Sequence, residues 1–255
     1  MENVKAVEVV HLSYRYADGH EALRDLHFSV EAGARVALIG PNGAGKSTLL
    51  QHLNGLLPED PPSSPAVSIF GQPISKDHGA RVRSQVGLLF QDPDDQLFCP
   101  TVFEDVAFGP AQGDLLEEDI ASLVSRSLSQ MGLEGFENRL PHHLSHGEKR
   151  RVCLAGLLAC DPKILALDEP TRDLDPRGRR ELKSLLARLP ITQIIATHDL
   201  ELVVELCSQA ILIDQGRLIA QGPPTDLLSD EKLMLAHGLE KPHILHHLHP
   251  KTLAQ

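Results

Sequence analysis

Three glycines and a lysine form the most chemically specific stretch of the sequence, GPNGAGKST at residues 40–48. An aliphatic run typical of a strand precedes it, and an amphipathic run typical of a helix follows. Glycines let the main chain fold into a concave loop whose N–H groups point inward, and the helix adds the positive end of its dipole. Lys46 can reach the β- and γ-phosphates of a nucleotide, and Ser47 offers a hydroxyl to Mg²⁺. A glycine-rich turn that binds nothing is the alternative, but it does not explain the flanking strand and helix.

Polar side chains also follow several of the buried strands that the sequence predicts. The run ILALDEP ends in Asp168 and Glu169, at the sheet edge where ligands bind in such folds. Asp168 can hold Mg²⁺, directly or through water, and Glu169 can take a proton from an attacking water. His198 in IIATHDL can contact a γ-phosphate, and Gln91 in GLLFQDP can ligate Mg²⁺ or orient water. An ordinary acidic pair and a structural histidine are the alternatives, and the nearby glycine-rich loop favours chemistry.

The stretch LSHGEKRRV, residues 144–152, is typical of the start of a helix. Ser145 can cap the first turn, and we expect the lysine and the arginines on the outer face of the helix. Gly147 lies in that first turn, where glycine weakens a helix. The sequence therefore predicts a helix N-terminus that carries small side chains and several N–H donors. This feature needs an explanation.

Hydrophobic periodicity predicts the elements that position these residues. We expect strands at residues 7–16, 26–30, 34–40, 66–74, 85–91, 163–170, 193–200, 210–216 and 217–222. The clearest helices are expected at residues 46–57, 116–133, 176–189 and 200–207. Strand–helix alternation around a mostly helical stretch predicts an α/β core with a parallel sheet and an inserted helical subdomain. We expect the core in 1–91 and 162–225, the helical subdomain in 92–161, and a C-terminal tail in 226–255.

Composition limits the class of protein. The 255 residues are 42% hydrophobic, which is enough for a normal core, and the net charge of −11 argues against a sequence-independent nucleic-acid binder. The sequence shows neither an apolar signal segment nor a run of the ~20 apolar residues that cross a bilayer. The cysteines match no zinc or redox spacing, so we expect reduced, buried thiols in a cytosolic protein. They are Cys99, Cys153, Cys160 and Cys207.

The motifs occur in the order and spacing of ATP-binding-cassette ATPases, and the sequence resembles that family over residues 4–225. LSHGEKRRV is similar to the family signature LSGGQ, and DLD at residues 173–175 also matches. The resemblance implies an ATPase that uses ATP and Mg²⁺, with a RecA-like P-loop NTPase core, a mixed sheet and an N-terminal antiparallel β subdomain. The implied nucleotide contacts from the loop are Asn42, Gly43, Ala44, Gly45, Lys46, Ser47 and Thr48. The implied Mg²⁺ ligands are Ser47, Gln91 and Asp168, and the implied catalytic residues are Glu169, His198 and Gln91.

The resemblance also explains the predicted helix N-terminus at Ser145 and Gly147. In this family two chains hold two ATP molecules head to tail, and the signature helix of one chain meets the γ-phosphate bound by the other. Carried over, Ser145 and Gly147 contact the partner's ATP, and Asp175 belongs to the loop that crosses the interface. Tyr16 matches the aromatic residue that stacks on adenine. Tyr14 is the alternative, because alternation puts both tyrosines on one face of the strand.

The sequence departs from the family pattern at four positions. His146 replaces a glycine and Glu148 a glutamine within the signature. Arg172 and Asp173 stand where small residues are usual, beside the interface loop. These last two residues leave the detailed contacts of that loop open.

Residues 91–110, QDPDDQLFCPTVFEDVAFGP, resemble the corresponding segment of energy-coupling-factor transporter ATPases, and those of cobalt and nickel uptake are the most similar. The resemblance implies a peripheral subunit on the cytoplasmic face of the cell membrane, acting as a homodimer or with a similar ATPase. Its other partners would be an integral membrane scaffold and substrate-binding membrane subunits, with no nucleic acid. Vitamin uptake by the same machinery is one alternative, and a soluble cassette of DNA repair or translation is another. A monomeric P-loop kinase is a third, but it leaves LSHGEKRRV unexplained.

Two other segments have compositions that favour partners. Residues 92–105 contain five carboxylates and no lysine or arginine, interleaved with apolar residues. An apolar groove with an acidic rim suits an arginine-bearing helix of a membrane partner, and a solvated acidic loop is the alternative. The tail contains five histidines, and neutral imidazoles bind Co²⁺ and Ni²⁺; a solvated histidine-rich tail is the alternative. They are His237, His243, His246, His247 and His249.

Overall fold

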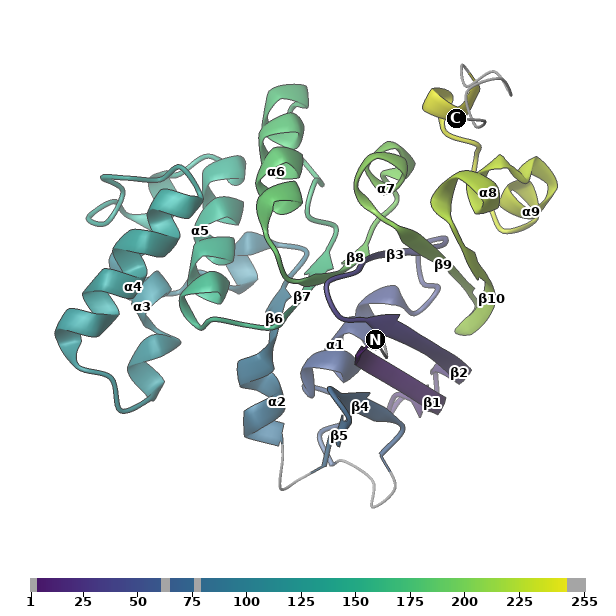
Figure 1. Ribbon diagram of the computed structural model, residues 1–255, viewed down its shortest axis with the longest axis horizontal. Helices are drawn as coiled ribbons and strands as arrows, with labels where there is room; N and C mark the ends of the chain where they lie inside the picture. The colour runs from purple at the N-terminus through teal and green to yellow at the C-terminus, as the bar shows by residue number, and fades with distance from the viewer. Residues whose placement is uncertain (1–3, 61–64, 76–78, 247–255) are drawn as a thin grey trace.

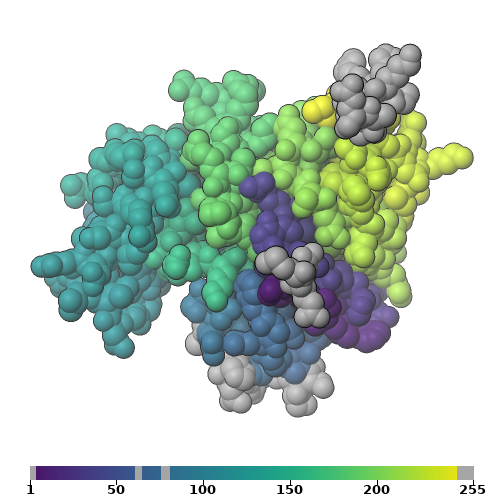
Figure 2. Space-filling model, viewed as in Figure 1, coloured from purple at the N-terminus to yellow at the C-terminus, as the bar shows by residue number. Residues whose placement is uncertain are grey.

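The computed structural model describes residues 4–60, 65–75 and 79–246, and Figure 1 shows how their helices and strands are arranged. In these ranges the chain forms two sheets, the helices that flank them, and an all-helical lobe. Figure 2 shows that lobe, coloured teal, at one side of the molecule. Within the described ranges, no helix is both long enough and apolar enough to span a bilayer.

The larger sheet has six strands in the order β10-β9-β3-β8-β7-β6. All neighbouring pairs are parallel except β9 and β10, which form an antiparallel hairpin. A turn at Gln215 and Gly216 joins these two strands, and both residues have positive φ, as a tight two-residue hairpin turn requires. The strands are β3 (Arg35–Ile39), β6 (Val86–Leu89), β7 (Ile164–Asp168), β8 (Thr192–Ala196), β9 (Gln209–Asp214) and β10 (Arg217–Gly222). The predicted mixed sheet is confirmed.

The smaller sheet is antiparallel, as predicted for the N-terminal region, with the order β2-β1-β4-β5. The sequence predicts one strand at 66–74, and this prediction is wrong. Phe70 and Gly71 both have positive φ and turn the chain, so the segment forms two short strands. The four strands are β1 (Lys5–Arg15), β2 (Glu21–Glu31), β4 (Val67–Ile69) and β5 (Gln72–Pro73).

Helices cover both faces of the larger sheet. In Figure 1, α1 lies between the two sheets, while α6 and α7 lie on the other side of the larger sheet. The helices outside the helical lobe are α1 (Lys46–Asn54), α2 (Gly79–Gln85), α6 (Pro176–Arg188), α7 (Leu200–Leu206), α8 (Pro224–Ser229) and α9 (Glu231–Ala236). Pro176 occupies the first turn of α6, where a missing N–H costs nothing.

The predicted helical insert is the lobe seen in Figure 2. Its three α-helices pack on one another through buried side chains such as Val106, Val124 and Val152. Both α3 and α5 begin with a capping box, in which a serine or threonine and a glutamate satisfy each other's N–H groups. The elements are η1 (Pro93–Asp95), α3 (Val102–Ala107), η2 (Pro110–Gln112), α4 (Glu117–Gln130), η3 (Pro141–His143) and α5 (His146–Ala159).

The larger sheet separates two hydrophobic cores, because successive side chains of a strand point to opposite faces. Val36 and Leu38 of β3 join the core that contains α1 and the antiparallel sheet. Ala37 and Ile39 of the same strand join the core that contains the helical lobe, α6 and α7. Both cores therefore hold the strands whose ends carry the predicted site residues.

Residues 226–246 belong to the predicted tail, and the structure folds them against the core. Met234, Leu239 and Leu245 are buried in the same cluster as the helical lobe. His237 also anchors this segment, since its Nδ1 lies 2.8 Å from the Asp214 carboxylate. The segment ends with η4 (His243–His246). His247 and His249 lie outside the described residues, so metal binding by the five histidines stays a prediction.

Candidate nucleotide-binding and hydrolytic site

The loop between β3 and α1 requires glycine at two positions. Gly40 has a φ of 147°, and a Cβ there would lie 1.9 Å from the Ile213 carbonyl oxygen. Gly45 has a φ of 102°, and its Cβ would lie 2.6 Å from the Ala22 carbonyl oxygen. Any larger side chain would clash with rigid main chain. The glycines therefore set the shape of the loop.

Helix α1 begins directly after this loop. Gly45 occupies the N-cap position, and no side chain caps the first turn, so its N–H groups stay available to an anion. The Lys46 ammonium group folds back and donates to the carbonyls of Gly40 at 2.8 Å and Pro41 at 3.0 Å. Burial lowers the pKa of Lys46, and the nearby carboxylates of Glu169 and Asp168 act in the opposite direction. The arrangement suits phosphate binding.

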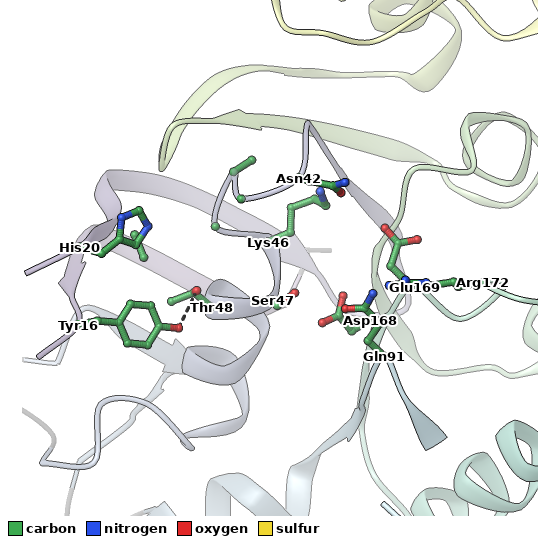
Figure 3. Close-up of a pocket in the computed structure, with 14 residues that line it drawn as sticks. Tyr16, His20, Asn42, Lys46, Ser47, Thr48, Gln91, Asp168, Glu169 and Arg172 are labelled. Atoms are coloured by element: carbon green, nitrogen blue, oxygen red, sulfur yellow. Dashed lines mark hydrogen bonds between the residues drawn. The ribbon is translucent and has the colours of Figure 1, made fainter. Parts of the chain in front are cut away.

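Four separate stretches of the chain converge on one cavity of about 390 Å³. Figure 3 shows Tyr16 and His20 at one end, Lys46 between, and a group of polar side chains at the other end. The predicted site residues that line the cavity are Tyr16, Asn42, Gly43, Ala44, Gly45, Lys46, Ser47, Thr48, Gln91, Asp168 and Glu169. His20 and Arg172 also line it, although the sequence pattern indicates neither as part of this pocket.

Of the two tyrosines considered for adenine, Tyr16 lies in the wall of this cavity. Its hydroxyl lies 3.0 Å from Thr48 Oγ1, and its ring stacks on His20 with a centroid distance of 6.5 Å. Tyr14 instead packs edge-on against His52 and lines a different pocket. A flat aromatic pair at the mouth of a phosphate-binding cavity suits a purine ring. The stacking role of Tyr16 stays a prediction.

The acidic pair ends β7, as the sequence predicts. Burial raises the pKa of Asp168, and a hydrogen bond from Ser47 only partly offsets that effect. A buried carboxylate of this kind is favoured in its ionised form by a bound cation. Asp168, Ser47 and Gln91 all line the cavity and supply carboxylate, hydroxyl and amide oxygens, which are the ligands that Mg²⁺ prefers. The donor set therefore fits Mg²⁺.

Glu169 takes a left-handed main-chain conformation, with a φ of 47°. Its carboxylate accepts from the Thr197 hydroxyl at 3.2 Å and from the His198 N–H at 3.3 Å. His198 Nδ1 lies 2.9 Å from the same oxygen, Oε2 of Glu169. Glu169 is buried, while the His198 side chain is 62% exposed. His198 lines an adjoining cavity of about 540 Å³, and Glu169 belongs to the walls of both cavities.

Arg150 corrects one prediction about α5. The sequence predicts the arginines of this helix on its outer face, but Arg150 is only 1% exposed. Its guanidinium donates to the carbonyl of Glu169 at 2.9 Å and to the carbonyl of Gln91 at 2.9 Å. Burial lowers the pKa of Arg150. The positive charge of Arg150 therefore lies between the helical lobe and the end of the cavity that Gln91 and Glu169 line.

Three predicted nucleotide-binding residues lie outside this cavity. Ser145 caps α5, since its hydroxyl accepts from the Glu148 N–H at 3.3 Å and donates to the Glu148 carboxylate at 2.7 Å. Gly147 lies in the first turn of that helix, and Asp175 caps α6 by accepting from the Gly178 N–H at 2.7 Å. The S-x-x-E spacing could have revealed the capping box from the sequence. Within the described part of one chain, neither Ser145 nor Asp175 lines the cavity that holds Lys46.

Comparisons with known proteins agree with the geometry. The family model described as ABC transporter matches residues 23–172. The energy-coupling factor transporter ATP-binding protein EcfA of Methanothermobacter thermautotrophicus is 47% identical over 92% of this chain and 76% of its own length. The structure of cbiO1 from Clostridium perfringens, described as part of the ABC transporter complex cbiONQ, has a TM-score of 0.80 and 38% identity, covering 95% of this chain and 98% of its own. A dimeric ATP-binding cassette, MJ0796 bound to ADP and Pi, has a TM-score of 0.75 and 26% identity, covering 86% and 98%.

The chain therefore belongs to the ABC transporter ATPases, in the group that contains the energy-coupling factor ATP-binding proteins. It is an ATP-binding and ATP-hydrolysing enzyme of the ABC type. The predicted family and enzyme class are confirmed.

Proposed function

We propose that this ATPase powers the import of a transition-metal ion, cobalt in preference to nickel, through an energy-coupling-factor transporter. The convergence of the glycine-rich loop, Gln91 and the acidic pair on one cavity carries the hydrolytic part of the proposal. The similarity to cbiO1 and the sequence of residues 91–110 support the metal cargo. A vitamin carried by the same machinery is the second candidate, because relatives named only as energy-coupling factor ATPases are 47% and 45% identical, more than the 38% of cbiO1.

The residues divide the work of hydrolysis among them. The N–H groups of the loop and Lys46 bind the β- and γ-phosphates, and Tyr16 stacks on the adenine. Ser47, Gln91 and Asp168 would hold Mg²⁺, which would supply positive charge beside the phosphates. Glu169 accepts a proton from the attacking water, and the Thr197 and His198 hydrogen bonds hold its carboxylate in place. The exposed imidazole of His198 contacts the γ-phosphate from the adjoining cavity.

A second chain completes the site. Ser145 and Gly147 of a partner subunit would meet the γ-phosphate, and Asp175 would lie in the loop that crosses between subunits. The dimeric arrangement of MJ0796, at 26% identity, supports two cassettes acting together. The partner is a second copy of this chain or a similar ATPase. The assembly would lie peripherally on the cytoplasmic face of the membrane, bound to a membrane scaffold and to substrate-binding membrane subunits, with no role for nucleic acid.

The acidic and apolar segment 92–105 is the proposed contact with the scaffold. Phe98 is 66% exposed, and its ring packs edge-on against the ring of Phe108, which is 47% exposed.

The acidic rim of this segment has fewer free carboxylates than the sequence suggests. The Asp94 carboxylate lies 2.6 Å from the Lys149 ammonium, and Asp105 turns inward to accept from two main-chain N–H groups. Of the remaining carboxylates, Asp92 caps η1 and Glu104 belongs to the capping box of α3, which leaves Asp95 as the freest charge.

Uptake measurements test the cargo. Cells expressing this chain with candidate membrane subunits should accumulate labelled Co²⁺, and Ni²⁺ more weakly. The same cells carrying Glu169→Gln should not accumulate either ion, although both proteins are made at equal levels. Uptake of a vitamin instead of the metals would favour the second candidate. ATPase activity without coupled uptake of any of them would refute the transport assignment.

A further inference from the structure

Arg150 connects three parts of the chain that are far apart in the sequence. It lies in the second turn of α5, and its two terminal nitrogens donate at 2.9 Å to the main-chain carbonyls of Glu169 and Gln91. Glu169 directly follows β7, and Gln91 follows β6 by two residues. One side chain of the helical lobe therefore holds the ends of two neighbouring strands of the nucleotide-binding core.

Packing alone does not explain this residue. Arg150 is 1% exposed, and among the described residues its hydrogen-bond partners are carbonyls, without the carboxylate that usually accompanies a buried cation. Its Nε is buried and has no hydrogen-bond partner within the described chain. Burying a charge costs free energy unless hydrogen bonds offset that cost, so these two hydrogen bonds need a reason beyond packing. An apolar side chain of similar length would fill the same space without that cost.

The geometry at Glu169 suggests what these hydrogen bonds achieve. Glu169 has a positive φ of 47°, a conformation that neighbouring structure must impose on a residue with a long side chain. Its N–H donates to the Ala196 carbonyl at 2.8 Å, and its own carbonyl accepts from Arg150. The main chain is thus held on both sides of the Cα. The direction in which the carboxylate projects depends on this conformation.

We propose that Arg150 is a positioning residue for ATP hydrolysis. It fixes the main chain of Glu169 and of Gln91 at a set distance from each other and from α5. Movement of the helical lobe then shifts both residues together relative to the phosphate-binding loop. The inference rests on the proposed roles of Glu169 as general base and of Gln91 at the Mg²⁺ and γ-phosphate.

Substitutions at Arg150 and at its neighbour separate positioning from packing. Arg150→Met keeps an unbranched side chain and removes both donors, whereas Arg150→Lys keeps the charge and one donor group. Arg151→Met is the matched control, because Arg151 lies on the same helix but its ion pair with Glu181 is 4.0 Å long and partly exposed. We expect Arg150→Met to lower kcat by about 10-fold or more while the KM for ATP changes less than about 3-fold. Arg150→Lys should recover part of kcat, and Arg151→Met should stay within about 2-fold of wild type.

A double variant tests whether Arg150 acts through Glu169. In the Glu169→Gln background, Arg150→Met should reduce the residual turnover by clearly less than it does in the wild-type background, because the part of its effect that acts through the Glu169 carboxylate is already gone and only the part that acts through Gln91 remains. Unchanged kcat in folded Arg150→Met, a change in KM alone, or a full additional 10-fold loss in the double variant would overturn the inference. If Arg150→Met fails to fold, Arg150→Lys serves as the test. A wild-type kcat in that folded variant would also overturn the proposed positioning role of Arg150. Wild-type turnover in Glu169→Gln alone would instead refute the proposed general base.

Discussion

Helices α1 and α5, the two that the sequence singles out for phosphate, begin in opposite ways. α1 follows Gly45, which has no side chain to cap it, so the first N–H groups remain available. α5 follows Ser145, whose hydroxyl is already engaged with Glu148. The N–H groups at the start of α1 are therefore available to an anion within one chain. A phosphate at the start of α5 would have to replace or share the hydrogen bonds of a capping box, and it would meet the Glu148 carboxylate there.

The largest effect should come from separating binding at α1 from hydrolysis at the end of β7. Glu169→Gln leaves the loop and Lys46 intact but removes the proposed proton acceptor, so we expect unchanged ATP binding and turnover lowered by about 10²-fold or more. A closed, ATP-bound dimer should accumulate, which size-exclusion chromatography with ATP and Mg²⁺ can detect. The control is Glu181→Gln, a partly exposed carboxylate on α6. Wild-type turnover in the Glu169 variant would contradict the assignment.

Mixing two inactive chains tests whether the ends of α1 and α5 belong to one shared site. Lys46→Ala damages the site at α1, and Ser145→Arg blocks the end of α5. A mixed dimer then has one composite site with both lesions and one with neither. We expect ATPase activity to return to a substantial fraction of wild type when one intact site suffices, although each variant alone is inactive. Full activity of either variant alone, or absence of an ATP-dependent dimer, would show that the two helix ends work independently.

Reversing charge beside the start of α5 tests the surface around that helix. Asp94→Lys together with Asp95→Lys should lower the affinity for the membrane scaffold several-fold and make assembly more sensitive to salt. Single changes should be nearly silent, since exposed charges contribute about 0–1 kcal/mol each. ATPase activity of the isolated subunit should stay within about 2-fold. Wild-type co-purification and uptake would show that residues 92–105 are not the docking surface.

The smallest expected effect concerns Glu148, the charge that distinguishes α5 from α1. Glu148→Gln keeps a capping partner for Ser145 but removes the carboxylate near the incoming phosphate. We expect the ATP-dependent dimer to form about 2- to 5-fold more tightly, as measured by analytical ultracentrifugation, because two like charges a few ångströms apart in water repel each other by about 1 kcal/mol or less. Glu134→Gln is a matched control, since Glu134 also accepts a hydrogen bond from a serine, Ser129, at 2.7 Å. Weaker dimerisation in the Glu148 variant would show that the carboxylate helps the interface.

The same substitution has a pH signature. The hydrogen bonds from Ser145, first its hydroxyl and then its N–H, lower the pKa of Glu148 below its ordinary 4.5. The ionised carboxylate therefore stabilises the fold above that ordinary pKa, and the contribution is lost as pH falls through the lowered value. Thermal unfolding should separate wild type from Glu148→Gln at pH 7, and the difference should vanish in strong acid. A difference that grows on acidification would contradict the capping interaction.

The sequence was sufficient where local pattern dictates local structure. The loop at Gly40 and Gly45 and the acidic pair after β7 follow from residue types and from strand–helix alternation. The burial of Arg150 could not be predicted, because helical periodicity among charged residues does not reveal that two carbonyls from distant segments accept its hydrogen bonds. His20 was missed for a similar reason, since only the fold brings the turn after β1 beside the phosphate loop.

Residues 226–246 are a second region whose packing the sequence does not reveal, in this case because of apolar side chains. Their histidines suggested a solvated or metal-binding tail, whereas Met234, Leu239 and Leu245 bury themselves in a cluster built by distant elements. Three separated apolar residues give no periodic signal. Among the described residues, no group of three potential metal ligands is found.

The division of the larger sheet between two cores has a consequence for exchanging parts between relatives. On β7, Ile164 and Ala166 face α1 and the antiparallel sheet, while Leu165 and Leu167 face the helical lobe. On this strand, a lobe transplanted from another family member would need to fit Leu165 and Leu167, and its α5 would also have to pack on β6 and keep the Arg150 hydrogen bonds. The nucleotide-binding face could be left as it is, because alternate positions of a single strand belong to separate modules.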